Sequence, residues 1–154
     1  MTKTLASDLL ASLGGRTIAT AESCTGGGIG AALTAIPGSS SVYVGGIISY
    51  TNEVKHALLG VPQQALSTFG AVSAPVAISM AQGVRSALRA DVALSVTGLA
   101  GPGGDDRGNP VGTVFIGYAD ATAAFAREYH FQGDRDAVRS QAVNAALELA
   151  LQQQ

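Results

Sequence analysis

A serine that precedes a cluster of glycines is the segment of this sequence best suited to nucleophilic chemistry. Ser23 stands in Ala-Glu-Ser-Cys-Thr-Gly-Gly-Gly, residues 21–28, between a predicted strand and a predicted helix. Glycines let a substrate approach the backbone closely, and the free N–H groups of a helix start can hold a phosphate or an oxyanion. The alternative is that Ser23 or Thr25 only caps the helix, as such residues commonly do.

A nucleophilic serine needs a base. The two histidines, His56 and His130, lie in no polar cluster of the sequence. Lys55, at the end of Tyr-Thr-Asn-Glu-Val-Lys (50–55), is the other candidate. A lysine whose pKa is lowered by burial can accept a serine proton. The alternative is an ordinary solvated lysine on a helix face.

Two further features are suited to binding an anion. The loop Thr-Gly-Leu-Ala-Gly-Pro-Gly-Gly (97–104) is rich in glycine, and such loops form nests of N–H groups; the alternative is a flexible surface loop. Arg135 and Arg139, four residues apart, can share one phosphate or lie on a solvated helix face. Asp105 and Asp106 have no histidine partners, so we expect a solvated loop tip and no metal site.

Hydrophobic spacing and turn residues predict the elements that position these groups. Helices are expected at 3–14, 25–35, 52–59, 62–69, 75–88 and after Asp134, and strands at 16–21, 42–50, 92–97, 111–118 and 123–131. Early strands alternate with helices and the last two strands pair as a hairpin. This order predicts one α/β domain over residues 1–154, a three-layer α/β/α sandwich with a mixed sheet.

Three polar residues fall at the ends of predicted strands. Ser23 follows the first strand, Tyr50 ends the second, and Thr97 ends the strand before the glycine-rich loop. Ligands of open α/β sheets bind outside the carboxyl ends of parallel strands. We therefore expect Ser23 and Thr97 to meet, and Tyr50 to join them if its strand is also parallel.

Composition narrows the class of protein. Charged residues make up 13% of the chain, against roughly 25% in an average domain. A surface this poor in charge predicts burial against another subunit, so we expect a homo-oligomer. The net charge of -2 gives no footprint of nucleic-acid binding, and no segment is long and apolar enough for a membrane span. With Cys24 as the one cysteine, no intramolecular disulfide forms, which fits the cytoplasm.

Six separated motifs resemble a known family. They are Ala-Glu-Ser-Cys-Thr-Gly-Gly (21–27), Tyr-Thr-Asn-Glu-Val-Lys (50–55), Gly-Ala-Val-Ser (70–73), Thr-Gly-Leu-Ala-Gly-Pro-Gly-Gly (97–104), Pro-Val-Gly-Thr-Val (110–114) and Phe-Gln-Gly-Asp-Arg-Asp-Ala-Val-Arg (131–139). Their types and order are similar to the C-terminal domain of the competence/damage-inducible protein CinA, which also exists as a stand-alone amidase of the PncC type. The resemblance covers nearly the whole chain.

The resemblance implies a three-layer α/β/α fold, a homodimer and a nicotinamide-nucleotide amidase. That activity converts nicotinamide mononucleotide and water to nicotinate mononucleotide and ammonia, in pyridine nucleotide recycling, without a cofactor or metal. The serine and lysine that such enzymes use match Ser23 and Lys55, and the tyrosine and threonine of the motifs match Tyr50 and Thr97.

Combining this resemblance with the local patterns, we expect a set of substrate-binding residues. N–H groups near Cys24 to Gly27 would stabilise the oxyanion, and the glycine loops with one or both arginines would hold the phosphate. This set is Cys24, Thr25, Gly26, Gly27, Gly101, Gly103, Gly104, Arg135 and Arg139.

One position departs from the family pattern. Many relatives carry a lysine before Pro-Val-Gly, where this chain has Asn109, and Arg107 is a candidate substitute. Two alternatives to a serine amidase stay open: a non-catalytic nucleotide-binding or regulatory domain of the same fold, and a thiol amidase with Cys24 as nucleophile.

Overall fold

The computed structural model describes residues 1–154. Five strands form one sheet in the order β2-β1-β3-β4-β5. β2 and β3 both run parallel to β1, whereas β4 is antiparallel to β3 and β5 is antiparallel to β4. The predicted mixed sheet is confirmed. The strands are β1 (Ile18–Glu22), β2 (Tyr43–Ile48), β3 (Val92–Gly98), β4 (Thr113–Ala119) and β5 (Ala124–His130).

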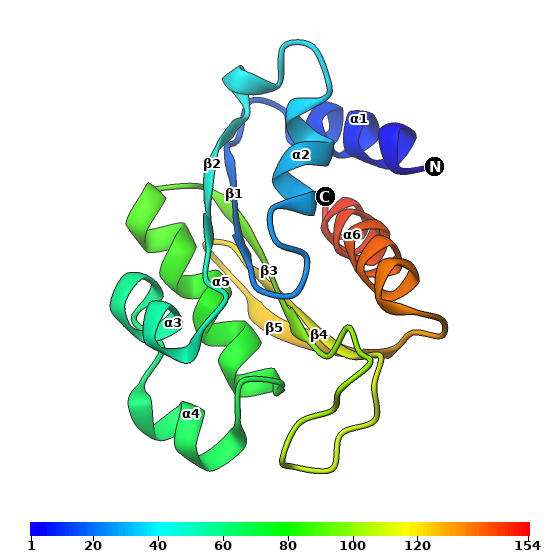
Figure 1. The fold of residues 1–154 in the computed structure, drawn as a ribbon. Coiled ribbons are helices and arrows are strands. Elements are labelled where there is room, and N and C mark those ends of the chain that lie inside the picture. Colours follow the sequence, from blue (N-terminus) through cyan, green and yellow to red (C-terminus); the bar gives the residue numbers. More distant parts are fainter.

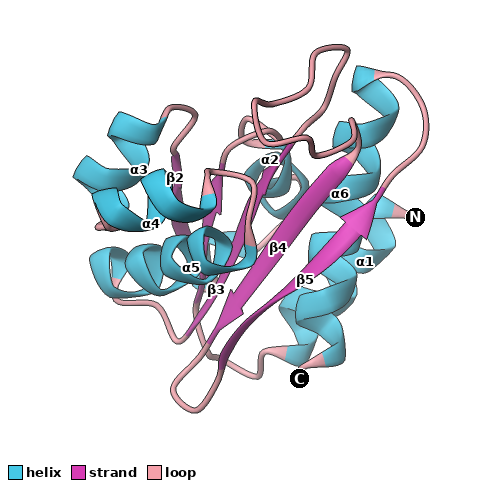
Figure 2. Ribbon diagram, turned by 90° about the horizontal axis from the view of Figure 1, so that it is seen from below, coloured by secondary structure: helices cyan, strands magenta, loops and turns pink.

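Helices cover both faces of the sheet, so the molecule has the three expected layers. One face carries α1, α2 and α6, and α5 crosses the other with α3 and α4 beside it (Figures 1 and 2). The helices are α1 (Thr2–Ser12), α2 (Gly28–Thr34), α3 (Asn52–Leu59), α4 (Gln63–Phe69), α5 (Ala74–Leu88) and α6 (Arg135–Gln152), with a short 3-10 helix η1 (Ser39–Ser41).

The core is divided by the sheet. All five residues of β1 are buried, because helices cover this central strand on both faces. Leu9, Leu33 and Leu147 belong to the cluster under α1, α2 and α6, and Val76 and Met80 belong to the smaller cluster under α5. Each such side chain contributes about 1.5–3 kcal/mol when it is fully buried. This packing on two sides fixes the strand ends that carry the polar residues.

Most predicted bounds differ from the structure by one or two residues, so that Tyr50 does not end β2 as predicted but follows its last residue, Ile48, by two. Two differences are larger. The second helix begins at Gly28 rather than at residue 25, because residues 23–27 form a separate turn. Gly26 and Gly27 have φ angles of 59° and 103° in this turn. Residues other than glycine rarely adopt such angles, and an α-helix does not contain them. The 3-10 helix η1 was not predicted, since its three serines carry no hydrophobic pattern.

The carboxyl ends of the three parallel strands lie at the same end of the sheet. There the turn after β1 lies beside the long loop between β3 and β4 (Figure 1). Because β2 is parallel to β1, Tyr50 lies at this same end of the sheet, two residues past the end of its strand. Thr97 is the next-to-last residue of β3. The strand ends therefore gather the three polar residues as expected.

Candidate active site

Ser23 and Lys55 meet in a direct hydrogen bond. The Lys55 Nζ lies 3.0 Å from Ser23 Oγ, and both side chains are buried, with 2% of Lys55 and 7% of Ser23 exposed. Lys55 comes from α3, whose first turn is capped by the Thr51 hydroxyl that accepts from the Val54 N–H. Lys55 is therefore not the solvated helix lysine that the sequence left open.

The Tyr50 carbonyl oxygen fixes this pair. It accepts from Lys55 Nζ at 3.2 Å and from Ser23 Oγ at 3.4 Å. A neutral amine has two N–H donors and one lone pair. One N–H bond to this carbonyl therefore leaves the lone pair free for the serine proton. Tyr50 therefore positions Ser23 and Lys55 through its backbone carbonyl and not through its ring.

Burial prepares Lys55 for proton transfer. Loss of solvent lowers the pKa of its amine from the ordinary value to about 8, while the nearby Cys24 has a small opposite effect. No carboxylate pairs with the amine, since the one ion pair in the structure joins His130 and Glu128. An amine with a pKa of about 8 is partly neutral near physiological pH, as a general base must be.

Cys24 is poorly suited to be the nucleophile. Burial raises the pKa of its thiol to about 11, so the reactive thiolate is scarce at neutral pH. Both histidines bond elsewhere, His56 to the Val61 carbonyl and His130 to Glu128. The geometry thus favours the hydroxyl of Ser23 over the neighbouring thiol.

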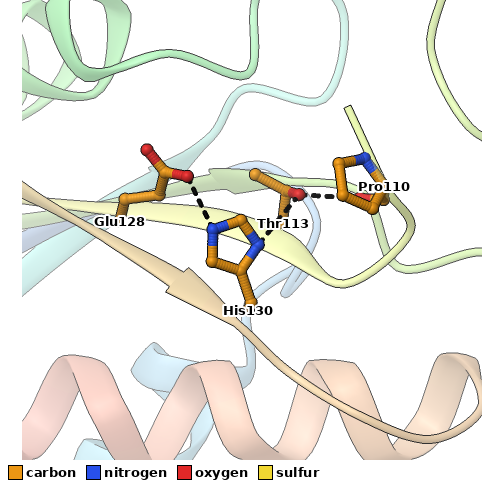
Figure 3. Close-up of polar contacts among 4 residues, drawn as sticks. All are labelled: Pro110, Thr113, Glu128 and His130. Atoms are coloured by element: carbon orange, nitrogen blue, oxygen red, sulfur yellow. Dashed lines mark hydrogen bonds and ion pairs between the residues drawn. The ribbon is translucent and has the colours of Figure 1, made fainter. Parts of the chain in front are cut away.

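Both histidines lie outside this pair. His130 Nε2 lies 2.6 Å from Glu128 Oε2, and its Nδ1 is 3.4 Å from Thr113 Oγ1, on the β4–β5 hairpin (Figure 3). The Thr113 hydroxyl donates to the Pro110 carbonyl and is not free to act as a nucleophile. His56 Nδ1 contacts the Val61 carbonyl at 2.7 Å. Neither ring can serve Ser23 as base.

A cavity of about 430 Å³ opens in front of the dyad. Ser23, Lys55, Tyr50 and Thr97 all line it, and the Thr97 hydroxyl donates to the Ala71 carbonyl at 2.9 Å. This bond ties the end of β3 to the segment before α5. It also leaves the lone pairs of the Thr97 oxygen for a donor in the cavity.

The structure divides the predicted substrate-binding residues into two groups. Cys24, Gly101, Gly103 and Arg135 line the cavity. Thr25, Gly26, Gly27, Gly104 and Arg139 do not. Their direct contact with substrate stays a prediction.

Arg135 joins two walls of the cavity. Its guanidinium donates to the Gly101 carbonyl at 2.7 Å and to the Tyr50 hydroxyl at 3.1 Å. Tyr50 is 58% exposed, so its ring stands at the cavity mouth. This places a cation beside the glycine-rich loop, where a phosphate can reach it.

Arg107 is a second cation of the cavity lining. It donates through both terminal nitrogens to the carbonyls of Ser67 and Thr68 in α4, and so ties the loop between β3 and β4 to that helix. Asn109 points elsewhere, because its side chain donates to Asp105 Oδ2 at 2.7 Å. Arg107 thus lines the cavity and Asn109 does not, while the substitution of Arg107 for the family's lysine stays a prediction.

Sequence reasoning missed Glu22 and gave the segment 70–72 no role in the site. Residues 70–72 line the cavity beside Thr97, although they were quoted only as a motif. Glu22 is 2% exposed and lies directly before Ser23. A charged residue directly after a predicted strand of mostly apolar residues was the signal that could have identified it.

Other kinds of site find no support in the geometry. The structure has no group of three or more His, Cys, Asp or Glu side chains that could hold a metal ion. No helix combines the length and hydropathy that crossing a bilayer requires.

The fold and the site together define a family. The model of the CinA C-terminal domain matches residues 2–154, and the chain belongs to this family. It is 53% identical over 126 residues to a CinA-like protein of Geobacter metallireducens, a match that covers 82% of this chain and 30% of that protein. The chain spans about a third of the length of the curated relatives that it matches.

Solved structures agree with this assignment. A competence-damaged protein (CinA) superfamily protein from Escherichia coli matches with a TM-score of 0.98 at 36% identity, and the match covers 100% of this chain and 91% of that chain. A superfamily protein from Klebsiella pneumoniae has a TM-score of 0.97 at 32% identity, covering 99% and 97%. These matches confirm the predicted α/β fold and the family.

Proposed function

We propose that the chain is a serine amidase that hydrolyses nicotinamide mononucleotide to nicotinate mononucleotide and ammonia. The observation that carries the proposal is the buried hydrogen bond of 3.0 Å between Lys55 Nζ and Ser23 Oγ, at the wall of a 430 Å³ cavity. A nucleophile within hydrogen-bond reach of its base is the signature of covalent catalysis. The carboxamide as the target comes from the family resemblance.

The first half of the reaction forms an acyl-enzyme. Ser23 Oγ attacks the carboxamide carbon and its proton passes to neutral Lys55 Nζ, so a C–O bond forms and the carbonyl becomes an oxyanion. The C–N bond then breaks as the protonated Lys55 gives its proton to the leaving nitrogen, which departs as ammonia. The Tyr50 carbonyl holds the amine through both transfers.

The second half consumes one water. Lys55 accepts a proton from the water as its oxygen attacks the Ser23 ester, and the C–O bond to Ser23 breaks. The proton returns to Ser23 Oγ, and nicotinate mononucleotide leaves. Arg135 at the cavity mouth is suited to the phosphate, because a guanidinium binds phosphate oxygens in a bidentate manner.

Ammonia release from nicotinamide mononucleotide tests the proposal. The wild type should release one ammonia per nicotinate mononucleotide, Ser23→Ala should lose that turnover, and Cys24→Ala should keep it. Full activity of Ser23→Ala would eliminate the serine mechanism. Nucleotide binding without turnover by the wild type would instead identify a non-catalytic regulatory domain.

We also propose a homodimer, on the charge-poor composition noted above, and a cytoplasmic location, on the single cysteine. Exposed Val44 and Ile48 on the edge strand β2 are consistent with a contact between subunits. Sedimentation equilibrium would show a mass of twice 15.4 kDa if the dimer forms.

A further inference from the structure

We propose that Arg139 is a positioning residue that orients the backbone N–H groups of the turn after Ser23, rather than a ligand of the substrate phosphate. The inference rests on the proposed function, since it concerns the oxyanion of that reaction. It also makes a statement about backbone geometry that can be tested without any turnover.

The guanidinium of Arg139 is committed to the turn. Its Nε donates to the Cys24 carbonyl at 3.0 Å, and one terminal nitrogen donates to the Thr25 carbonyl at 3.3 Å. Arg139 does not line the cavity, in contrast to Arg135 one helical turn earlier. The two arginines that the sequence assigned to one phosphate therefore point to different partners.

Binding a carbonyl also fixes an N–H group. The Cys24 carbonyl and the Thr25 N–H belong to one planar trans peptide, in which they point in opposite directions. Arg139 therefore sets the direction of the Thr25 N–H. A cation on the carbonyl also polarises the peptide and strengthens its N–H as a donor.

The next peptide is fixed in the same way. Arg139 holds the Thr25 carbonyl, and the N–H of Gly26 donates to the Ser23 carbonyl at 3.0 Å. The turn is thus closed on itself and held by α6. Gly26 leaves room for the contact, because a Cβ there would lie 3.4 Å from the Arg139 Nη2 in a backbone with φ of +59°.

Glu22 determines which N–H groups stay available. Its buried carboxylate accepts from the Thr25 hydroxyl at 2.7 Å, from the Ile29 N–H at 2.8 Å and from the Gly30 N–H at 3.0 Å. The start of α2 is therefore closed to an anion.

Other N–H groups around Ser23 are occupied as well. The N–H of Ser23 donates to the Val96 carbonyl, and that of Gly28 donates to the Thr25 carbonyl. The N–H groups of Cys24, Thr25 and Gly27 donate to no other residue of the protein. Two successive free N–H groups directly after a nucleophile are what an oxyanion hole requires.

Kinetics of Arg139→Lys and Arg139→Gln separate positioning from phosphate binding. We expect kcat to fall about 10- to 100-fold, the range for a displaced oxyanion donor, while KM changes less than about threefold. The loss should be the same for nicotinamide mononucleotide and for the riboside, which lacks the phosphate. The matched control is Arg127→Gln, an exposed arginine that donates to Gln152 and should leave both constants unchanged.

The opposite pattern would overturn the inference. A phosphate ligand would raise KM for the mononucleotide about tenfold or more, keep kcat, and leave the riboside unaffected. Unchanged kinetics in both variants would also overturn it.

A structural measurement covers the case in which the wild type shows no turnover, which would be a failure of the proposed function alone. Residual dipolar couplings report the direction of each backbone N–H. Arg139→Gln should change the couplings of Cys24 and Thr25 and leave those of the sheet at their wild-type values, which also shows that the variant folds. Couplings of Cys24 and Thr25 equal to those of the wild type would refute the positioning role.

Discussion

Lys55→Met should make the protein more stable while it abolishes catalysis. Burial lowers the pKa of the Lys55 amine from 10.5 to about 8, which corresponds to about 3 kcal/mol of unfavourable free energy for the charged form in the folded state. Methionine has a similar unbranched shape and no charge. It removes the bonds of Lys55 to the Tyr50 carbonyl and to Ser23, which keep only the 3.4 Å bond to each other, and this loss costs about 1 kcal/mol. We therefore expect a net gain of about 2 kcal/mol in the free energy of unfolding at pH 7.

The pH dependence of this gain identifies its cause. Between pH 8 and 10.5 the unfolded chain still binds the Lys55 proton while the folded chain has released it. Stability of the wild type therefore rises with pH across this window, relative to a variant without the amine. The advantage of Lys55→Met should be complete below pH 8 and decline steadily toward pH 10.5.

Urea denaturation of the wild type and the variant at pH 7, 8, 9 and 10 measures this difference. The matched control is Lys3→Met, which removes the only other lysine, an exposed one on α1, and should change stability by less than about 0.5 kcal/mol. If Lys55→Met is less stable than the wild type, or if its gain in the free energy of unfolding stays constant from pH 7 to 10, burial does not lower the pKa of the Lys55 amine as inferred.

Four further perturbations test the site and its support. The kcat/KM of the wild type should fall about tenfold per pH unit below pH 8 and level off above it, because only neutral Lys55 accepts the serine proton; a plateau that extends to pH 6 would contradict this assignment. Cys24→Ala should keep kcat within about threefold, since burial raises the pKa of the thiol and keeps it protonated; a loss near 100-fold would favour the thiol mechanism. Arg107→Ala should raise KM about tenfold with little change in kcat, because the loop loses its bonds to α4, and steady-state kinetics that show the reverse would refute this. Gly83→Ala should lower the free energy of unfolding by more than about 2 kcal/mol, because the added Cβ would overlap the Leu59 carbonyl; a variant that melts at the same temperature as the wild type would disprove this close contact.

The elements with strong hydrophobic periods could be predicted from the sequence. The helix over 52–59 has the predicted bounds, and α5 and β3 differ from the prediction by one residue at an end. Each is bounded by a glycine, proline or polar residue that stops the pattern. The mixed sheet followed from the order of these elements, because a hairpin must be antiparallel and strands linked through helices are commonly parallel.

The turn 23–27 shows where sequence patterns end. A run of three glycines after a serine is compatible with a helix start or with an irregular turn, and local propensity does not separate them. What decides is Glu22, whose carboxylate bonds to N–H groups seven and eight residues later, and Arg139, more than 100 residues away. Contacts this distant along the chain leave no periodic signal.

The pKa of Lys55 could not be obtained from the sequence either. The residue lies on a short helix whose pattern is equally typical of a solvated lysine. Burial comes from its position at the meeting of α3 with the ends of β1 and β2, and this position depends on the complete fold. The family motif identified the residue, but only the geometry explains why its amine is suited to be a base.

The structure also shows that the Ser23 side chain does not cap the helix that follows it. Neither the Ser23 hydroxyl nor the Thr25 hydroxyl accepts from the N–H groups of α2, because the carboxylate of Glu22 accepts from Ile29 and Gly30 in their place. Because Glu22 at the end of β1 accepts these bonds, the Ser23 hydroxyl is free to face Lys55. Glu22 also shields the helix start from anions, so that the nearest free donors lie directly after the serine. Glu22, the last residue of β1, thus accepts the bonds of the helix start, and this leaves the adjacent Ser23 available for the nucleophilic attack proposed above.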